Sequence, residues 1–256
     1  MQPISSYTLD NHLRVVLQGP PGRGKSCLAA QFPRPYFIDL DIGLGSVIRW
    51  CERTKMQLPV GFDRLDIDES GAVVPPKLQY QRMARLVEEA RNNPGIDTIV
   101  FDSATNLSPV LEAEVCRQQM KNSKDDFKDG RQFWGFYYTL GTHLMSQLKL
   151  LRKHVVLIAH EKENKLADGS LVYPIKIAWP GQLGNIIGAF FTDVWRCETE
   201  TKGIGASAIV DYLIRTNPEF KYELKNSLGL PTLWHFKWAD IEAKLKGGIH
   251  RAPCDQ

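Results

Sequence analysis

Short apolar runs recur along the first two thirds of the chain and lead directly into polar residues. They consist mostly of β-branched and aliphatic side chains. Apolar runs of about five residues are typical of central strands in a parallel sheet, which is covered on both faces. The strands predicted in this way span Leu13–Gln18, Tyr36–Leu40, Thr98–Asp102 and Val155–Ala159.

The segments between these runs carry apolar residues at helical spacing. Leu78–Asn92 and Phe136–Leu151 each repeat apolar residues at intervals close to the helical turn, and Lys25–Gln31 is a shorter helix-like run. Strands that alternate with helices predict βαβ units. We therefore expect an α/β fold with a mostly parallel central sheet flanked by helices.

The pattern changes after residue 185. Ala189–Cys197, Ala208–Arg215 and Leu233–Phe236 resemble strands joined by turns. This spacing predicts antiparallel strands at the C-terminal edge of the sheet. No linker is evident, so we expect a single domain over residues 1–246. Residues 247–256 contain Gly-Gly and Pro and are expected to form a flexible tail.

Composition and charge narrow the class of protein. The net charge of +3 leaves room for a local basic patch but does not by itself indicate a nucleic-acid partner. None of the five cysteines sits in a CxxC pair, so neither a zinc site nor a disulfide framework is indicated. The first ten residues are polar, and no apolar run approaches a membrane span. We expect a cytoplasmic protein (host cytoplasm if phage-encoded) without a membrane partner.

A phosphate-binding loop follows the first predicted strand. Gly19–Ser26 matches the pattern GxxxxGK[ST] and leads into a predicted helix. Glycines let successive backbone N–H groups face phosphates, and the helix N-terminus adds partial positive charge. Lys25 is expected to reach the β and γ phosphates of ATP, and Ser26 to ligate Mg²⁺. The expected nucleotide-contacting residues are Gly19, Pro20, Pro21, Gly22, Arg23, Gly24, Lys25, Ser26 and Cys27.

Acidic residues end two other predicted strands. Asp102 follows four apolar or β-branched residues, which is the form expected of the Walker B carboxylate that accompanies Ser26 at the metal. A simple cap of the following turn is the alternative. Asp39 and Asp41 follow another strand, and either could orient the attacking water. Alternation places both on one face if the strand continues that far, whereas turn formation before Gly43 is the alternative.

In this order, the motifs resemble the RecA recombinase superfamily. The chain is most similar to the short RecA-like ATPases of bacteriophages that assist single-strand annealing, over residues 12–232. The resemblance implies that Asp41 is the general base where the family has a glutamate. It also places His160, at the end of the fourth strand, where RecA has a glutamine that senses the γ-phosphate; a solvated strand end is the alternative. Leu224–Ser227 resembles a Lys-Asn-Lys motif that acts on the ATP of an adjacent subunit.

Within that motif Lys225 matches the first lysine, whereas Ser227 stands where the family has the second. The positive charge of the motif is therefore halved, unless Lys221 or Arg215 replaces it. ATP is therefore expected at an interface between subunits of an oligomer. The catalytic residues so implied are Lys25, Asp41, Asp102, His160 and Lys225.

Two segments correspond to the DNA-facing loops of the family. Arg117–Trp134 combines basic residues with the start of an aromatic run, and Glu161–Asn185 adds further lysines. Cations pair with phosphates and rings stack on bases in proteins that bind single-stranded DNA. A solvated charged face and a surface hairpin are the alternatives, and much of the aromatic run is expected to be core. The candidate DNA-binding residues are Lys121, Lys124, Lys128, Arg131, Lys162 and Lys165.

These features predict an ATPase that is stimulated by single-stranded DNA and works in phage-type recombination, annealing or replication. A single-strand annealing or single-strand-binding protein is a further candidate partner. Two other functions stay open. The chain could be a nucleotide-dependent switch that loads or regulates a partner such as a helicase. It could also be a small-molecule P-loop kinase, although no Arg-rich lid sequence is visible.

Overall fold

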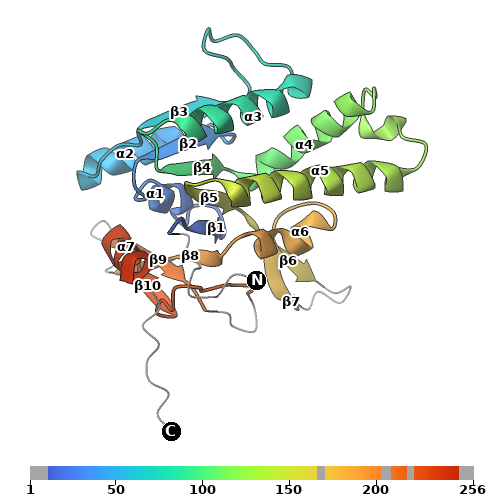
Figure 1. Cartoon of the computed structure of the whole chain (residues 1–256). Coiled ribbons are helices and arrows are strands. Elements are labelled where there is room, and N and C mark those ends of the chain that lie inside the picture. Colours follow the sequence, from blue (N-terminus) through green and yellow to red (C-terminus); the bar gives the residue numbers. More distant parts are fainter. Residues whose placement is uncertain (1–10, 166–170, 203–208, 218–221, 248–256) are drawn as a thin grey trace, which may run out of the picture.

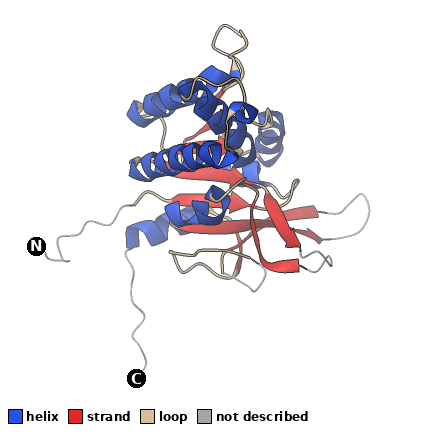
Figure 2. Ribbon diagram, turned by 90° about the vertical axis from the view of Figure 1, so that its right-hand side faces the viewer, coloured by secondary structure: helices blue, strands red, loops and turns tan. Residues whose placement is uncertain are grey.

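The computed structural model describes residues 11–165, 171–202, 209–217 and 222–247. Within these residues, one sheet of eight strands has the order β10-β9-β8-β1-β5-β4-β2-β3. Helices cover both faces of the sheet (Figures 1 and 2). A separate antiparallel hairpin, β6–β7, lies below the main sheet in Figure 1. The predicted fold class is therefore confirmed.

The central strands are parallel and close to their predicted bounds. β1 pairs with β5, β5 with β4, and β4 with β2, all in parallel register. β8 also runs parallel to β1, whereas β9 and β10 are antiparallel, which confirms the predicted C-terminal edge. The strands are β1 Arg14–Gln18, β2 Pro35–Asp39, β3 Gly61–Arg64, β4 Thr98–Asp102, β5 His154–Ala159, β6 Glu161–Lys165, β7 Leu171–Ile177, β8 Asp193–Lys202, β9 Ile209–Arg215 and β10 Leu233–His235.

The helices include several that the hydrophobic pattern did not predict. They are α1 Lys25–Ala29, α2 Leu44–Thr54, α3 Pro76–Asn92, α4 Ala104–Gln118, α5 Gly130–Leu150, α6 Leu183–Ile186 and α7 Trp238–Gly247, with 3-10 turns η2 Lys124–Asp126 and η3 Ile187–Phe190. The prediction that the long helix begins at Phe136 was wrong, because α5 begins six residues earlier. Asp129 caps its start, its carboxylate accepting the Arg131 N–H at 2.8 Å.

Alternation along the strands divides the core between the two faces of the sheet. In β4, Ile99 and Phe101 join the cluster that includes α3, α4 and α5, while Val100 joins the cluster beneath α1 and α2. All three side chains have no exposed surface. The apolar runs in the sequence therefore reflect strands buried on both faces. This leaves the strand ends as the positions where polar side chains can gather.

Helices α4 and α5 form an antiparallel pair that extends beyond the sheet (Figure 1). A buried hydrogen-bond chain joins this pair to the segment after β7. The hydroxyls of Ser108 and Tyr137 lie 2.8 Å apart, and the Trp179 indole N–H donates to the same Tyr137 oxygen at 2.6 Å. Because buried polar groups are costly when unpaired, this chain fixes the orientation of α5.

Two expectations on domain organisation lie partly outside the described residues. α7 extends to Gly247, and residues 248–256 of the predicted tail lie beyond the described part of the chain. The single domain over residues 1–246 stays a prediction. None of the described helices combines the length and the apolar character that a membrane span requires.

Candidate functional site

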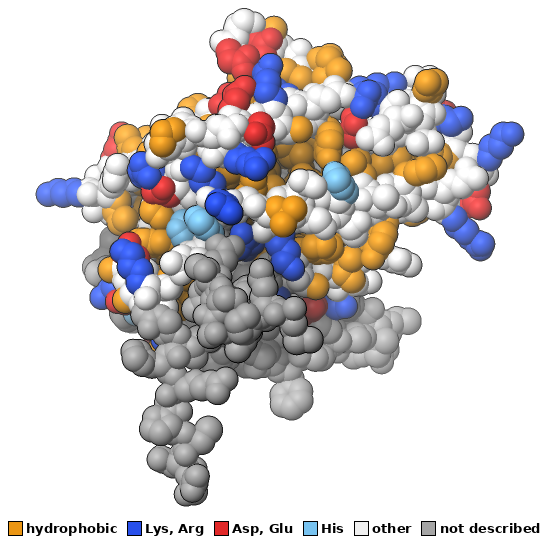
Figure 3. Space-filling view, viewed as in Figure 1, with side chains coloured by type: hydrophobic (Ala, Val, Ile, Leu, Met, Phe, Trp, Pro, Cys, Tyr) orange, Lys and Arg blue, Asp and Glu red, His pale blue; other side chains and the backbone are white. Residues whose placement is uncertain are grey.

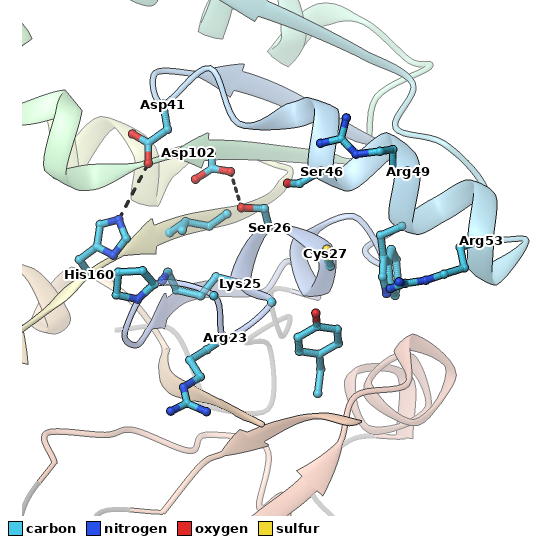
Figure 4. Close-up of a pocket in the computed structure, with 16 residues that line it drawn as sticks. Arg23, Lys25, Ser26, Cys27, Asp41, Ser46, Arg49, Arg53, Asp102 and His160 are labelled. Atoms are coloured by element: carbon cyan, nitrogen blue, oxygen red, sulfur yellow. Dashed lines mark hydrogen bonds and ion pairs between the residues drawn. The ribbon is translucent and has the colours of Figure 1, made fainter. Parts of the chain in front are cut away.

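The carboxyl ends of the parallel strands meet at one edge of the sheet and form a pocket of about 480 Å³. Ligands bind at this edge in open α/β sheets. Figure 4 shows the labelled side chains converging on it from several elements. The lining residues are Pro21, Gly22, Arg23, Gly24, Lys25, Ser26, Cys27, Asp41, Ser46, Arg49, Trp50, Arg53, Asp102, Ile158, His160 and Tyr212.

Lys25 lies at the start of α1 and is held by the phosphate-binding loop itself. Its side-chain ammonium donates to the carbonyl oxygens of Gly19 and Pro20, both at 2.9 Å. Only 6% of the residue is exposed, and burial lowers the pKa of its ammonium. A cation held by the carbonyl oxygens of a phosphate-binding loop is well placed to meet a phosphate.

Gly24 is required by both backbone and packing. Its φ of 72° lies in the left-handed region, which favours glycine. A Cβ at this position would lie 2.3 Å from the Tyr212 ring. The loop thus packs directly against β9, which forms one wall of the pocket.

Ser26 and Asp102 form the central contact of the site. The Ser26 hydroxyl donates to Asp102 Oδ2 at 2.6 Å, joining α1 to the end of β4 (Figure 4). Asp102 is 3% exposed, and burial raises the pKa of its carboxyl to about 6, with the charges of Asp41 and Asp39 adding to this effect.

This pair fits the expected Mg²⁺ site. Mg²⁺ is usually bound through one or two carboxylates together with substrate phosphates and water, not by an all-protein cage. A hydroxyl and a buried carboxylate beside a phosphate-binding loop provide that donor set. In the part of the chain that the structure describes, no group of three or more His, Cys, Asp or Glu forms a metal cluster. Ser26 and Asp102 therefore remain the residues that would hold the ion.

The structure separates the two aspartates that follow β2. The expectation that they share a face does not hold, because the strand ends at Asp39 and the chain turns. The Asp39 carboxylate accepts the N–H groups of Asp41 and Gly43 at 3.2 and 3.3 Å, so it shapes the turn. Asp41 instead lines the pocket, and its Oδ1 accepts from Ser103 at 2.9 Å and from Asn106 at 2.6 Å. Asp41 is the carboxylate placed to meet a nucleotide.

His160 follows β5 and faces Asp41 across the same end of the pocket. Its Nε2 lies 4.0 Å from Asp41 Oδ2 (Figure 4). Burial lowers the pKa of the imidazole, and the positive charge of Lys25 lowers it further. Its Nδ1 is buried without a hydrogen-bond partner among the described residues. A neutral imidazole with one unsatisfied nitrogen is suited to hydrogen bond with a ligand.

Glu161, the residue after His160, forms an ion pair with β8. It pairs with Arg196 at 2.7 Å, and Arg196 also pairs with Glu198 at 2.7 Å. The Glu161 side chain is only 6% exposed. Because breaking a buried ion pair is strongly destabilising, a shift of His160 would strain this pair and the β6–β7 hairpin that begins at Glu161.

The remaining predicted loop residues take supporting positions. Arg23 lines the pocket and donates a hydrogen bond to the Thr199 hydroxyl on β8. Burial raises the pKa of the Cys27 thiol to about 11, so this residue stays a neutral thiol in the pocket wall. Pro21 and Gly22 also line the pocket, whereas Gly19 and Pro20 contribute their carbonyl oxygens to Lys25.

Sequence reasoning missed several residues that line the pocket. They are Ser46, Arg49, Trp50 and Arg53 of α2 and Tyr212 of β9. Figure 4 places Arg53 near Cys27, away from Asp41 and His160. Arginines four residues apart with a tryptophan between them, directly after the Asp41 turn, were a usable signal for α2. Tyr212 lies far away in sequence and had no such signal.

Lys225 lies outside this pocket in its own chain. Its ammonium donates to the carbonyl oxygens of Gly188, at 3.2 Å, and of Phe191. Its backbone pairs with Val194 of β8. Arg215, one possible replacement for the missing second lysine, pairs with Glu198 at 2.7 Å, and Lys221 lies outside the described residues. A role for Lys225 at a neighbouring subunit stays a prediction.

The predicted DNA-facing segments adopt regular structure. Arg117–Trp134 is not a long loop, because it contains the end of α4, η2 and the start of α5. Lys124 forms a loose pair with Glu112, at 3.8 Å. Glu161–Asn185 contains the β6–β7 hairpin and part of α6.

Four of the six candidate DNA-binding residues lie at the projecting end of the α4–α5 pair. These are Lys121, Lys124, Lys128 and Arg131. Lys162, on the hairpin, donates to the Trp179 carbonyl at 3.0 Å. The side chain of Lys165 is not among those described. Figure 3 shows basic and hydrophobic side chains together on this projecting end.

Comparison with known proteins identifies a family. The model of a family described as an AAA domain matches residues 11–228, so the chain belongs to that family. Among curated proteins, none matches the chain significantly. Among solved structures, the chain is similar to the KaiC-like protein of the hyperthermophilic archaeon Pyrococcus horikoshii OT3, with 18% identity, a TM-score of 0.41 and 83% of each chain covered. The family match makes the pocket that of a P-loop ATPase domain.

The raised pKa of Asp102 predicts a specific pH dependence of stability. Its ordinary value is 3.8 and its value in the fold is about 6, so the native state binds more protons than the unfolded state in this interval. The free energy of unfolding then falls, through this group, as pH rises from about 4 to about 6.

Asp102→Asn removes this titration and keeps an acceptor for Ser26. Above pH 6 we expect it to raise the free energy of unfolding by about 2 kcal/mol, measured by urea denaturation with EDTA present. Asp240→Asn, at an exposed position on α7, serves as the control. If the difference in free energy of unfolding between Asp102→Asn and wild type stays constant across this pH interval, the pKa of Asp102 is not raised in the fold.

The aromatic side chains of the pocket predict a separable contribution to nucleotide affinity. Trp50→Ala should weaken ATP binding by about fivefold, because a base stacked on the ring would lose roughly 1 kcal/mol of binding free energy. It should leave the affinity for inorganic tripolyphosphate unchanged, since the loop contacts only phosphates. Isothermal titration with both ligands checks this, with Trp134→Ala on α5 as the matched control. Equal losses for the two ligands would show that Trp50 does not contact the base.

Proposed function

We propose that this member of the AAA domain family hydrolyses ATP and acts with single-stranded DNA in phage-type recombination, annealing or replication. One observation carries the catalytic part of the proposal: Lys25, Ser26, Asp102, Asp41 and His160 lie around one pocket. They come from four separate segments of the chain, because Lys25 and Ser26 are neighbours in α1. Holding charges in place before reaction is usually the largest contribution to such catalysis.

The catalytic roles follow from position in the pocket. Lys25 meets the β and γ phosphates. Ser26 and Asp102 would hold a magnesium ion, which would supply positive charge beside the phosphates. Asp41 orients the water that attacks the γ-phosphorus and accepts its proton. His160, neutral because burial lowers its pKa, hydrogen bonds near the γ-phosphate and reports its presence. Release of phosphate would then relax the Glu161–Arg196 pair at the base of the hairpin.

The role of single-stranded DNA rests on the α4–α5 pair and the hairpin. Basic residues there accompany exposed rings, since Trp134 and Phe136 are 40% and 43% exposed. Proteins that bind single strands combine such cations and stacking platforms. Self-association, with Lys225 of one subunit acting on the ATP of the next, is part of the same proposal, as is an annealing or single-strand-binding protein partner.

A nucleotide-dependent switch is the second candidate, favoured by the surroundings of Asp41. Two donors, Ser103 and Asn106, already occupy Asp41 Oδ1. A carboxylate oxygen that already accepts two hydrogen bonds has little room to accept a proton from an attacking water. A protein of this kind would hold ATP with slow turnover and change its affinity for a protein partner.

An ATPase assay with and without single-stranded DNA tests the proposal. We expect DNA to raise the rate of wild type, and Lys25→Ala to abolish hydrolysis, a loss of about a hundredfold or more, because no other pocket cation is buried in the loop. Lys149→Ala, an exposed lysine on α5, is the matched control and should keep wild-type activity.

The possible outcomes separate the candidates. A rate that ignores DNA, together with no DNA retention at low salt, would rule out the DNA part of the proposal. Slow turnover with nucleotide-dependent partner binding would favour the switch. Hydrolysis that survives in Lys25→Ala would refute the assignment of the loop.

A further inference from the structure

Two grooves that the ATP site does not use lie on neighbouring stripes of α5. The first has a volume of about 460 Å³ and lies between α5 and the segment that begins α6. The second has a volume of about 470 Å³ and lies between α5 and the end of α4. Both are lined by Gly135, so they meet at this residue.

The first groove has fixed aromatic walls. Trp134 and Tyr138 line it, and Tyr137 is its buried floor, 1% exposed and hydrogen bonded to Trp179 and Ser108. The Trp134 ring packs so closely on Gly181 that an added Cβ there would lie 3.2 Å from the ring. The walls therefore exist before any ligand binds, which limits the entropy lost on binding.

The second groove, on the next stripe of α5, also has aromatic walls and carries basic side chains. Phe127 and Phe136 line it, with ring centroids 6.5 Å apart. Lys121 and Lys128 lie along it. Each groove thus combines exposed ring surface with at least one cation.

Gly135 has no packing reason to be glycine. It lies inside α5, where glycine costs about 1 kcal/mol relative to alanine. A Cβ added at this position would meet nothing within 4 Å. The absence of a side chain instead keeps the ridge between the two grooves low, so that a chain can cross from one to the other.

Charge identifies the kind of ligand. Lys121, Lys128 and Arg131 are the charged side chains among the described residues that line the two grooves, and all are basic. The acids of the same stretch, Asp125, Asp126 and Asp129, do not line either groove. Asp126 accepts the backbone N–H groups of Asn122 and Ser123, and Asp129 caps α5. A polyanion with flat apolar groups fits these surroundings, whereas an acidic groove would repel it.

We propose that the two grooves hold neighbouring bases of single-stranded DNA, with the sugar-phosphate backbone crossing α5 at Gly135. This rests on the single-stranded DNA role in the proposed function. Trp134 and Phe136 stack on the bases, and Lys121, Lys128 and Arg131 pair with the phosphates. Stacking accepts any base, so binding is largely independent of sequence.

The test compares an oligothymidylate with an abasic oligonucleotide of the same length by fluorescence anisotropy. Wild type should bind the oligothymidylate at least about tenfold more tightly, because stacking contributes 1–3 kcal/mol per base. Trp134→Ala should weaken oligothymidylate binding by roughly five- to tenfold and leave abasic binding unchanged. Gly135→Leu, which raises the ridge that the sugar-phosphate backbone crosses, should weaken binding of both strands. Trp134→Phe, which keeps a ring, should retain most of the affinity.

Two matched controls lie off the proposed path. Phe62→Ala removes an exposed ring on β3, and Gln147→Leu places a leucine on an exposed position three turns further along α5. Both should bind DNA as wild type does. Thermal melts of all variants verify that each is folded.

The outcomes distinguish this inference from the function on which it rests. DNA binding that Trp134→Ala and Gly135→Leu both leave intact, or a loss in Trp134→Ala that is equal for the abasic strand, would overturn the base grooves while DNA binding stands. Wild type that binds no single-stranded DNA would overturn both. If an aromatic acidic peptide binds the grooves and oligothymidylate does not compete with it, the grooves belong to a protein partner. That result would also overturn the inference.

Discussion

The hydrogen bond between Ser26 and Asp102, at 2.6 Å, is the contact on which the site depends. It joins the first turn of the helix after the phosphate-binding loop to the end of β4, two strands away from the strand that leads into the loop. Burial makes the Asp102 charge costly, and that cost is reduced when a cation or donor is present. The site is therefore suited to positive charge next to phosphate, a combination that a Mg²⁺–nucleotide complex would present.

Several elements that follow strands of the sheet line this pocket. Lys25, Asp41 and His160 line it together with Trp50 and Tyr212, and Arg53 of α2 lies away from Asp41 and His160 (Figure 4). His160 is followed at once by Glu161, whose buried pair with Arg196 fixes the start of the β6–β7 hairpin. His160 in the pocket thus follows β5, and the α4–α5 pair begins after the adjacent strand, β4. A change at the γ-phosphate has a short covalent route to the segments proposed to contact DNA.

The sequence predicted β1, β2, β4 and β5 well because each is buried on both faces and reads as an apolar run, as Thr98–Asp102 does. It did not predict the parallel edge strand β3, which is only partly buried. Strand ends then placed Lys25, Asp102 and His160 around one pocket. Local turn geometry was harder: β2 ends at Asp39, so Asp39 and Asp41 diverge instead of sharing a face. Tyr212 could not be found, because its place beside Gly24 depends on packing between residues almost two hundred positions apart.

The central claim is that Asp41, which lines the pocket, enables hydrolysis, whereas Asp39 only shapes the turn. Single-turnover hydrolysis with Mg²⁺ and ATP, alongside ATP affinity, tests it most directly. Asp41→Asn should bind ATP as wild type does and lose hydrolysis by about a hundredfold or more, the size expected for loss of a general base. Asp39→Asn, which retains an acceptor for the turn, should hydrolyse ATP at close to the wild-type rate. Full activity in Asp41→Asn, or a selective loss in Asp39→Asn, would contradict the account.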